Sequence, residues 1–311
     1  MPTKLIKVIK TKSELAEILK IDLSHLEQVS KEKQKHYRKI TELKNGKERV
    51  YSVADKILGQ IHQSIDRNIL NKLDFPKEIN GGIKGRSRST NAIPHIGSSN
   101  LAHFDIRNFY PSTKPSKVFV SFRSLSIWTE PAKLLTSLTT TDHLPIGFAT
   151  STKISALILT KLNRRLGPFL KKFGIKHTLW VDDLTLSGDY PIKKLHPVIK
   201  TIIEDEGYTL NEKKSDKSKI AYKRQAQVVT GININNDLSA ERAKVDQVKR
   251  VIYVSRKFGA CKYIDTNEVG ISTKELKEKM AGRLGNLLSI NKVKYKPLQD
   301  SWKKIIAEQK L

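Results

Sequence analysis

Two adjacent aspartates, Asp182 and Asp183, interrupt the otherwise strand-like stretch LWVDDLTLSG. Successive side chains of a strand point to opposite faces, so both carboxylates can serve one site only where the chain turns. Apolar residues flank the pair on both sides, which predicts a hairpin with the two aspartates at its tip. Like charges at such close range require a counter-cation.

A third carboxylate, Asp105, lies in the aromatic-rich stretch LAHFDIRNFY, and this pattern predicts a strand with Asp105 within it or at its end. The three carboxylates would form an oxygen-ligand site for two Mg²⁺ ions, which could activate a hydroxyl and stabilise a leaving pyrophosphate. The alternative for an isolated Asp-Asp pair is a polar turn without chemistry, because aspartate is common in turns.

The composition favours a polyanionic partner. The 311 residues include 58 Lys and Arg against 31 Asp and Glu, which gives a net charge of +27. With 38% hydrophobic residues, the chain can bury a core for one large domain or two to three subdomains.

The single cysteine, Cys261, excludes a disulfide framework and a thiolate zinc site. The N-terminus lacks an apolar signal core and no apolar run approaches about 20 residues, so we expect a cytoplasmic protein without a membrane span.

Local patterns predict the elements that position the aspartates. Thr11 and Glu14 form a capping-box pattern at the start of a helix. Two strand-like runs flank Asn45-Gly46, a dipeptide suited to a tight hairpin turn. After this hairpin, isoleucines at four-residue spacing predict one helical face, made of Ile57, Ile61, Ile65 and Ile69.

Helices are also expected between about residues 114 and 170 and over the last part of the chain, from about residue 240. In this last part, Val245, Val248 and Ile252 share one predicted face. A second capping box, from Ser272 to Glu275, begins a helix whose predicted apolar face comprises Leu276, Met280, Leu284 and Leu288.

Three stretches resemble the catalytic blocks of reverse transcriptases and follow the family's order: HFDIRNFYPS, LPIGFATSTKISAL and WVDDLTLS. Two more, NAIPHIG and VVTGI, resemble the NAxxH and VTG elements of the retron type. The chain is therefore similar to retron-type reverse transcriptases from about residue 11 to residue 290. Group II intron maturases and diversity-generating enzymes share the catalytic blocks but not typically this pair of elements.

The resemblance implies an α+β fold of the right-hand polymerase type, with fingers, an antiparallel palm sheet and a helical thumb. On this basis we expect N-terminal helices and fingers in residues 1–100. The palm, with interleaved fingers elements, is expected in residues 101–236. A helical, RNA-binding thumb is expected in residues 237–311.

The resemblance also assigns the metal site. Asp105 and Asp182 are the expected direct ligands, Asp183 supports them, and the backbone carbonyl of Ile106 adds a ligand. Lys214, in LNEKKS, matches a lysine proposed to protonate the leaving pyrophosphate. Phosphate binding or simple solvation is the alternative for a lysine in so basic a segment.

Nucleotide binding is expected from the fingers and from the first catalytic block. Tyr110 matches the steric gate, whose ring would clash with a ribonucleotide 2′-hydroxyl; a core tyrosine is the alternative. Arg49 matches the residue that clamps the triphosphate, with Lys47 or Lys56 as helpers, although a solvated hairpin charge is the alternative for Lys47. Gly147 matches the glycine that lets the backbone approach the template and primer.

Seven residues are expected to contact RNA or the template and primer: Asn91, His95, Trp180, Thr230, Gly231, Lys249 and Arg250. For His95 the alternative is a buried structural histidine. Trp180 stands where the family has tyrosine, which keeps a stacking surface but loses the hydroxyl. The basic C-terminal helices would bind structured RNA through phosphates and shape.

The resemblance implies an enzyme that copies part of a noncoding RNA into DNA, with Mg²⁺ and deoxynucleoside triphosphates. Priming from a guanosine 2′-hydroxyl would leave a branched RNA-DNA product. A bacterial anti-phage role and a separate toxic effector protein are implied as well. The enzymatic alternative is a diversity-generating or abortive-infection enzyme, which Ile146 favours because most retron enzymes have glutamine there. The non-enzymatic alternative is an RNA-binding protein on a polymerase scaffold.

Overall fold

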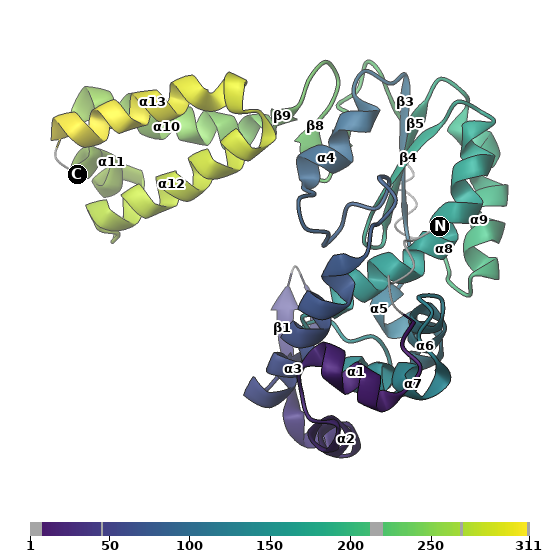
Figure 1. Cartoon of the computed structure of the whole chain (residues 1–311). Helices are drawn as coiled ribbons and strands as arrows, with labels where there is room; N and C mark the ends of the chain where they lie inside the picture. The colour runs from purple at the N-terminus through teal and green to yellow at the C-terminus, as the bar shows by residue number, and fades with distance from the viewer. Residues whose placement is uncertain (1–7, 45, 212–219, 268–269, 310–311) are drawn as a thin grey trace. The chain divides into compact units, whose positions relative to one another are not determined.

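The computed structural model in Figure 1 describes residues 8–44, 46–211, 220–267 and 270–309. Its contacts divide the chain into two compact units. The first unit comprises Met1–Ser87 and Asn100–Ile220, and the second comprises Arg88–Ser99 and Ala221–Leu311. A short segment from the N-terminal third of the sequence therefore belongs to the C-terminal unit.

The first unit contains most of the helices. They are α1 (Lys12–Leu19), α2 (Leu23–Lys31), α3 (Lys56–Asn68), α5 (Phe109–Ser112), α6 (Pro115–Arg123), α7 (Thr129–Thr139), α8 (Ser151–Lys171) and α9 (His196–Asp205), with short 3₁₀ turns at Lys33–His36, Leu70–Lys72 and Ile192–Leu195. The predicted cap of α1 is confirmed, since the Thr11 hydroxyl accepts a hydrogen bond from the Glu14 amide at 3.1 Å. On the predicted face of α3, Ile61 and Ile65 are buried, as is Ile69 directly after the helix, whereas Ile57 in the first turn is 38% exposed. This residue precedes the stretch of α3 that the core covers.

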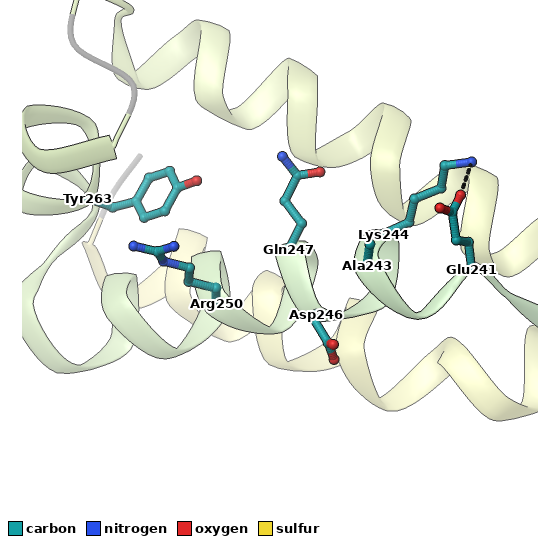
Figure 2. Close-up of a pocket in the computed structure, with 7 residues that line it drawn as sticks. All are labelled: Glu241, Ala243, Lys244, Asp246, Gln247, Arg250 and Tyr263. Carbon is teal, nitrogen blue, oxygen red and sulfur yellow. Dashed lines mark ion pairs between the residues drawn. The ribbon is translucent and has the colours of Figure 1, made fainter.

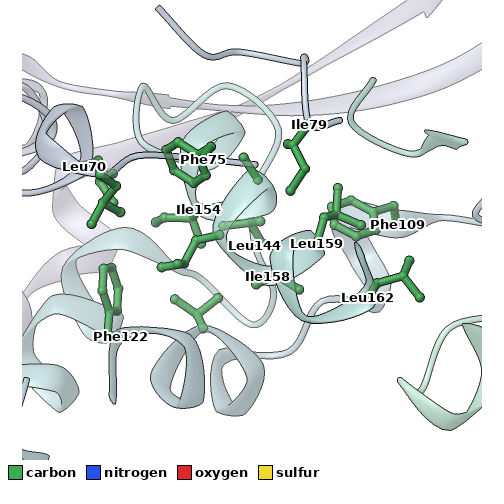
Figure 3. Packing of buried hydrophobic residues seen from close by; sticks show 14 of the residues in the cluster. Leu70, Phe75, Ile79, Phe109, Phe122, Leu144, Ile154, Ile158, Leu159 and Leu162 are labelled. Carbon is green, nitrogen blue, oxygen red and sulfur yellow. The ribbon is translucent and has the colours of Figure 1, made fainter. Parts of the chain in front are cut away.

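An antiparallel sheet carries the predicted chemistry. Strand β5 (Asp183–Gly188) pairs with both β3 (Asn100–Asp105) and β4 (Lys176–Trp180). Four consecutive residues of β5, Leu184 to Ser187, are buried, so both faces of this central strand are covered. Figure 3 shows the apolar core of the unit, where side chains of α8 such as Ile154, Ile158 and Leu162 pack among aromatic residues from other segments.

A separate hairpin pairs β1 (Tyr37–Lys44) with β2 (Lys47–Ala54) over their whole length. Gly46, in the turn, has φ +70°, the left-handed conformation that glycine adopts without strain. The predicted hairpin is confirmed, although Asn45 lies outside the described residues. Its outer part is open to solvent, with Leu43 75% exposed.

The second unit combines short strands with long helices. Its elements are α4 (Arg88–Ala92), a 3₁₀ turn at Ile93–His95, β6 (Ala221–Tyr222), β7 (Val228–Val229), β8 (Ile232–Asn233), β9 (Ser239–Ala240), α10 (Arg242–Phe258), α11 (Ala260–Asn267), α12 (Thr273–Ile290) and α13 (Lys292–Gln309). The capping box of Ser272 and Glu275 is confirmed in both directions. On the predicted face of α12, Leu276, Met280 and Leu284 are buried. At the end of this face Leu287 is buried in place of Leu288, so the prediction for Leu288 was wrong.

The α+β class, with an antiparallel sheet and a helical C-terminal part, is confirmed by these elements. The boundaries of fingers, palm and thumb stay predictions. None of the helices in the described ranges is long and apolar enough to cross a bilayer.

Candidate active site

The predicted hairpin joins β4 to β5, but its turn lies one residue earlier than expected, so that Asp182 is in the turn and Asp183 is the first residue of β5. Strand β4 ends at Trp180 and β5 begins at Asp183, so Val181 and Asp182 form the connection. Asp105, the last residue of β3, pairs directly with Asp183 across the sheet. The amide of Ile106 donates a hydrogen bond to the Asp182 carbonyl at 3.0 Å. The pairing of β3 with β5 therefore brings the backbone of all three aspartates to one end of the sheet.

A residue that the sequence did not single out holds Asp105. Asn211 Nδ2 donates to Asp105 Oδ2 at 2.8 Å, and the Asn211 amide donates to the Asp105 carbonyl at 2.9 Å. These two hydrogen bonds fix both the backbone and one carboxylate oxygen of Asp105. The available signal was only the position of Asn211 within LNEKKS, and Lys214 of that stretch lies outside the described residues.

The donor set fits a magnesium site that substrate completes. Among the described residues, no group of three or more His, Cys, Asp or Glu side chains is arranged to hold a metal ion. Magnesium typically takes one or two carboxylates, several waters and substrate phosphates. Asp105 and Asp182 are half-buried at neighbouring strand ends, and Asp183 is exposed. The Ile106 amide faces Asp182, so its carbonyl lies on the same side of the strand.

Tyr110 connects the aspartates to the start of α8. Burial raises the pKa of its hydroxyl, hydrogen bonds with Thr152 and Ser155 partly offset this, and the charge of Asp182 raises the pKa further. The hydroxyl is therefore protonated at neutral pH. The ring is half-buried and meets Phe109 edge-on, at 5.6 Å between ring centroids.

Gly147 makes a close backbone contact of a kind that was not predicted. Its φ is +108°, and a Cβ there would lie 2.6 Å from the Ser52 carbonyl oxygen of β2. The Ser52 amide also donates to the Ile146 carbonyl at 2.7 Å. This glycine therefore lets the second catalytic block meet the base of the β1–β2 hairpin, and its contact with template and primer stays a prediction.

The expected triphosphate clamp lies on the open hairpin and beside it. Arg49 is an exposed residue of β2 and pairs across the hairpin with Glu42. Lys47 begins β2, and Lys56, the first residue of α3, is exposed. The exposed charges of Arg49 and Lys56 are accessible to a triphosphate, and the binding role of all three residues stays a prediction.

Comparison with known proteins adds to this geometry. The chain is 33% identical over 191 residues to the Retron Ec86 reverse transcriptase of Escherichia coli, a match that covers 60% of this chain and 59% of that protein. It is 27% identical over 265 residues to the Retron Se72 reverse transcriptase of Salmonella heidelberg (strain 579083-10), covering 79% and 68%. The chain is a sequence relative of the retron-type reverse transcriptases. The Retron Mx65 reverse transcriptase of Myxococcus xanthus is 25% identical over 206 residues, covering 60% and 48%.

The matches to Retron Ec86 and Mx65 span only about half to three fifths of those relatives' own length. No family model matches the chain. A solved structure of telomerase from Candida albicans in complex with a fragment of telomeric RNA aligns with a TM-score of 0.48 at 11% identity, covering 99% of this chain and 71% of that chain.

The two stretches that resemble retron signatures meet in the second unit. NAIPHIG runs through α4 and the following 3₁₀ turn, and α4 contacts both β7 and β8, which flank the turn of VVTGI. In that turn Thr230 and Gly231 both have positive φ, and Thr230 Oγ1 donates to the Arg88 carbonyl at 3.4 Å. The Gly97 amide donates to the Ile234 carbonyl at 3.2 Å. The retron-like elements are therefore one packed substructure, although they are more than a hundred residues apart in sequence.

The remaining residues expected to contact RNA differ in exposure. Asn91 and His95 have fully buried side chains in the second unit, and their role in RNA recognition stays a prediction. Trp180 is half-buried at the end of β4, whereas Lys249 and Arg250 are exposed on α10. In Figure 2, Arg250 lies beside Tyr263 in a hollow of about 560 Å³ that Lys244 and Gln247 also line.

Proposed function

We propose that the protein is an RNA-directed DNA polymerase. The observation that carries the proposal is the register of the sheet, which pairs Asp105 with Asp183 and leaves Asp182 in the adjoining turn. When bound, Mg²⁺ would activate the primer hydroxyl and neutralise the leaving pyrophosphate. Asp105 and Asp182 would hold the metal, with Asp183 and the Ile106 carbonyl in support.

The chain's own residues would divide the remaining work. Asn211 orients Asp105 through its hydrogen bond to Oδ2. Tyr110 would place its ring against the incoming sugar and exclude a 2′-hydroxyl, while its protonated hydroxyl binds Thr152 and Ser155. Arg49, with Lys47 or Lys56, would bind the triphosphate, since a guanidinium presents several donors to phosphate oxygens.

The template would be part of a structured noncoding RNA, and priming from a guanosine 2′-hydroxyl would give branched RNA-DNA. The named relatives and the retron-like elements in the second unit support this refinement. The net charge of +27 and the exposed Lys249 and Arg250 suit binding to RNA phosphates. We further propose a cytoplasmic role in bacterial anti-phage defence, together with a separate effector protein.

A diversity-generating enzyme is the second candidate, and Ile146 favours it. This residue lies in the second catalytic block, next to Gly147, and its carbonyl accepts the Ser52 amide. A DNA product with errors confined to template adenines would identify that class. The non-enzymatic candidate is an RNA-binding protein on a polymerase scaffold. It requires that the wild-type protein binds RNA but makes no DNA.

The deciding experiment expresses the protein with its native upstream DNA and extracts the nucleic acid. We expect a small RNase-resistant DNA in the wild type that debranching enzyme shortens. The same DNA should be missing from the Asp182→Asn/Asp183→Asn variant. An unbranched product would reject retron priming, and no DNA in the wild type would reject the polymerase.

A further inference from the structure

A loop between α3 and α4 runs directly beside the turn that carries the aspartates. The loop is closed by Arg86, whose guanidinium donates to the backbone carbonyls of Phe75, Pro76 and Ile79. Phe75 and Ile79 are buried in the core of the first unit. Three backbone carbonyls held by one cation, with two apolar anchors, make this loop a fixed part of the first unit.

The loop extends the sheet at the edge of β4. The Leu179 amide donates to the Glu78 carbonyl at 2.7 Å, and the Asn80 amide donates to the Leu179 carbonyl at 2.8 Å. Ile79 and Leu179 form a parallel bridge. The loop thus pairs with β4 at the last residue before Trp180, and the next loop residues, Gly81 and Gly82, continue alongside the turn.

Gly81 lies against the backbone of the turn itself. A Cβ on this buried residue would lie 2.6 Å from the Val181 amide nitrogen and 3.2 Å from the Trp180 carbonyl carbon. Ordinary contacts between carbon atoms are about 3.5–4.0 Å. Any side chain at Gly81 would therefore push on the Trp180–Val181 peptide bond, one residue before Asp182.

Val181 is the residue of this turn that most needs support. Its φ of +56° is left-handed, a conformation that is an outlier for a β-branched residue. Such backbone strain persists only where surrounding structure imposes it. Gly81 packs against this turn on one side, and on the other the Ile106 amide donates a hydrogen bond to the Asp182 carbonyl.

Gly82 lies against Thr152, at the start of α8. Its φ is +73°, and a Cβ would lie 2.0 Å from Thr152 Cγ2 and 2.8 Å from Thr152 Cβ. Thr152 is also a hydrogen-bond partner of the Tyr110 hydroxyl. Two consecutive glycines therefore contact the aspartate turn and the partner of the expected steric gate.

We propose that Gly81 and Gly82 are positioning residues that set the aspartate turn and Tyr110 relative to each other. The proposal rests on the polymerase function proposed above. Gly81 acts through Val181 on the two carboxylates, and Gly82 acts through Thr152 on the tyrosine. Neither glycine touches substrate in this role. Because one acts on the metal site and the other on the expected steric gate, their substitutions should change different kinetic constants.

The test compares Gly81→Ala and Gly82→Ala with Gly85→Ala in the purified full chain. Gly85 is the matched control, because it has φ +80° in the same loop but nothing within 4 Å of an added Cβ. We expect Gly81→Ala to lower kcat for primer extension by about 100-fold, the effect of a displacement of about 1 Å, with KM for nucleotide little changed. It should also weaken Mn²⁺ binding measured by electron paramagnetic resonance, whereas Gly85→Ala should do neither.

Gly82→Ala should instead reduce the preference for deoxynucleotides over ribonucleotides. Adding Thr152→Ser to that variant removes the clashing methyl and keeps the hydroxyl for Tyr110, so we expect part of the preference to return. Gly82 is exposed, and it therefore carries the test if Gly81→Ala does not fold.

Wild-type kinetics and Mn²⁺ affinity in both glycine variants would overturn the proposal, as would equal losses in Gly85→Ala. A wild type that makes no DNA would reject the polymerase function instead. In that case Mn²⁺ affinity still reports whether Gly81 positions the carboxylates.

Discussion

The first unit contains two hairpins with expected roles at one site, and their surroundings differ. The β4–β5 hairpin has β3 on one side and the loop of Gly81 on the other, so its turn is held from both directions. Within the described part of the chain, β1 and β2 form a two-stranded sheet that no third strand joins. Metal ligands must be in place before substrate arrives, whereas a triphosphate clamp can close around its ligand.

The β1–β2 hairpin is fixed at its base and open beyond it. At the base, the ring of Tyr37 meets Phe148 at 5.7 Å between centroids, and His62 meets the same ring at 4.6 Å. Farther out, Leu43 and Val50 are 75% and 50% exposed. A two-stranded hairpin is marginally stable alone, so we expect its outer part to adapt to bound nucleotide.

The largest effect should come from the rigid hairpin. Asp182→Asn removes a charge from the expected metal site, and we expect extension of a primed RNA template to fall by about 1,000-fold, because metal stabilisation is worth several kcal/mol. Asp189→Asn, at an exposed position just after β5, is the control and should extend normally. If Asp182→Asn extended the primer as well as Asp189→Asn does, the β4–β5 turn would have no special role in synthesis.

Substitution of Tyr110 tests whether the site beside the β4–β5 turn discriminates against ribonucleotides. Tyr110→Ala should raise ribonucleotide incorporation relative to deoxynucleotides by about 10- to 100-fold, the range for one lost steric contact. Tyr110→Phe keeps the ring and should discriminate as the wild type does. Competition between labelled nucleotides measures the ratio, and unchanged discrimination in Tyr110→Ala would assign this residue to the core.

Arg49 tests the open hairpin. Arg49→Ala should raise KM for nucleotide by about tenfold with a smaller change in kcat, since a charge-assisted hydrogen bond is worth about 1.5–3 kcal/mol and part of it is replaced by solvent. Lys39→Ala is the control, because Lys39 is an exposed residue whose side chain points to the other face of the hairpin. If both variants raise KM alike, the hairpin contributes only general positive charge.

Lowering the pH should destabilise the base of the β1–β2 hairpin, and this effect should be smaller than those of the substitutions above. Burial lowers the pKa of His62, an effect that the hydrogen bond to the Leu138 carbonyl and the charge of Asp66 partly offset. Below about pH 6.5 the unfolded chain binds the proton more readily than the folded one, so stability falls as pH decreases. We expect Tm to drop between pH 7 and pH 5. The protection factor of the Ser52 amide, which corrects for the pH dependence of intrinsic hydrogen exchange, should fall first, because this amide donates to the Ile146 carbonyl at the base of the hairpin.

His62→Gln should flatten that pH dependence, although His177, whose pKa burial also lowers, keeps part of it. His25→Gln, at an exposed position on α2, should leave it unchanged. A slope that is the same in all three proteins would contradict the role of His62.

Local patterns predicted both hairpins well. The Asp-Asp pair between apolar runs and the Asn45-Gly46 dipeptide each determine a turn within a few residues, and the capping box at Ser272 is equally local. Periodicity was less exact at the ends of helices, as Ile57 and Leu288 show, because tertiary packing decides where burial begins and ends.

The supporting contacts could not be read from the sequence. Asn211 reaches Asp105 across 106 positions, and Gly81 meets Val181 across a similar distance. No periodic pattern marks such pairs, since each depends on how complete elements pack. A Gly-Gly dipeptide in a basic stretch predicts a loop, but which backbone it approaches depends on the tertiary structure.

The membership of residues 88–99 in the second unit limits how this protein can be divided. Ser89 Oγ donates to the Ser289 carbonyl at 2.9 Å, and Gln227 Nε2 donates to the Ser98 carbonyl at 3.0 Å. A protein cut after Ile220 would keep a segment whose partners are gone. Moving the second unit between related chains therefore means transplanting two separate stretches of sequence together, because this unit is compact in space and discontinuous in sequence.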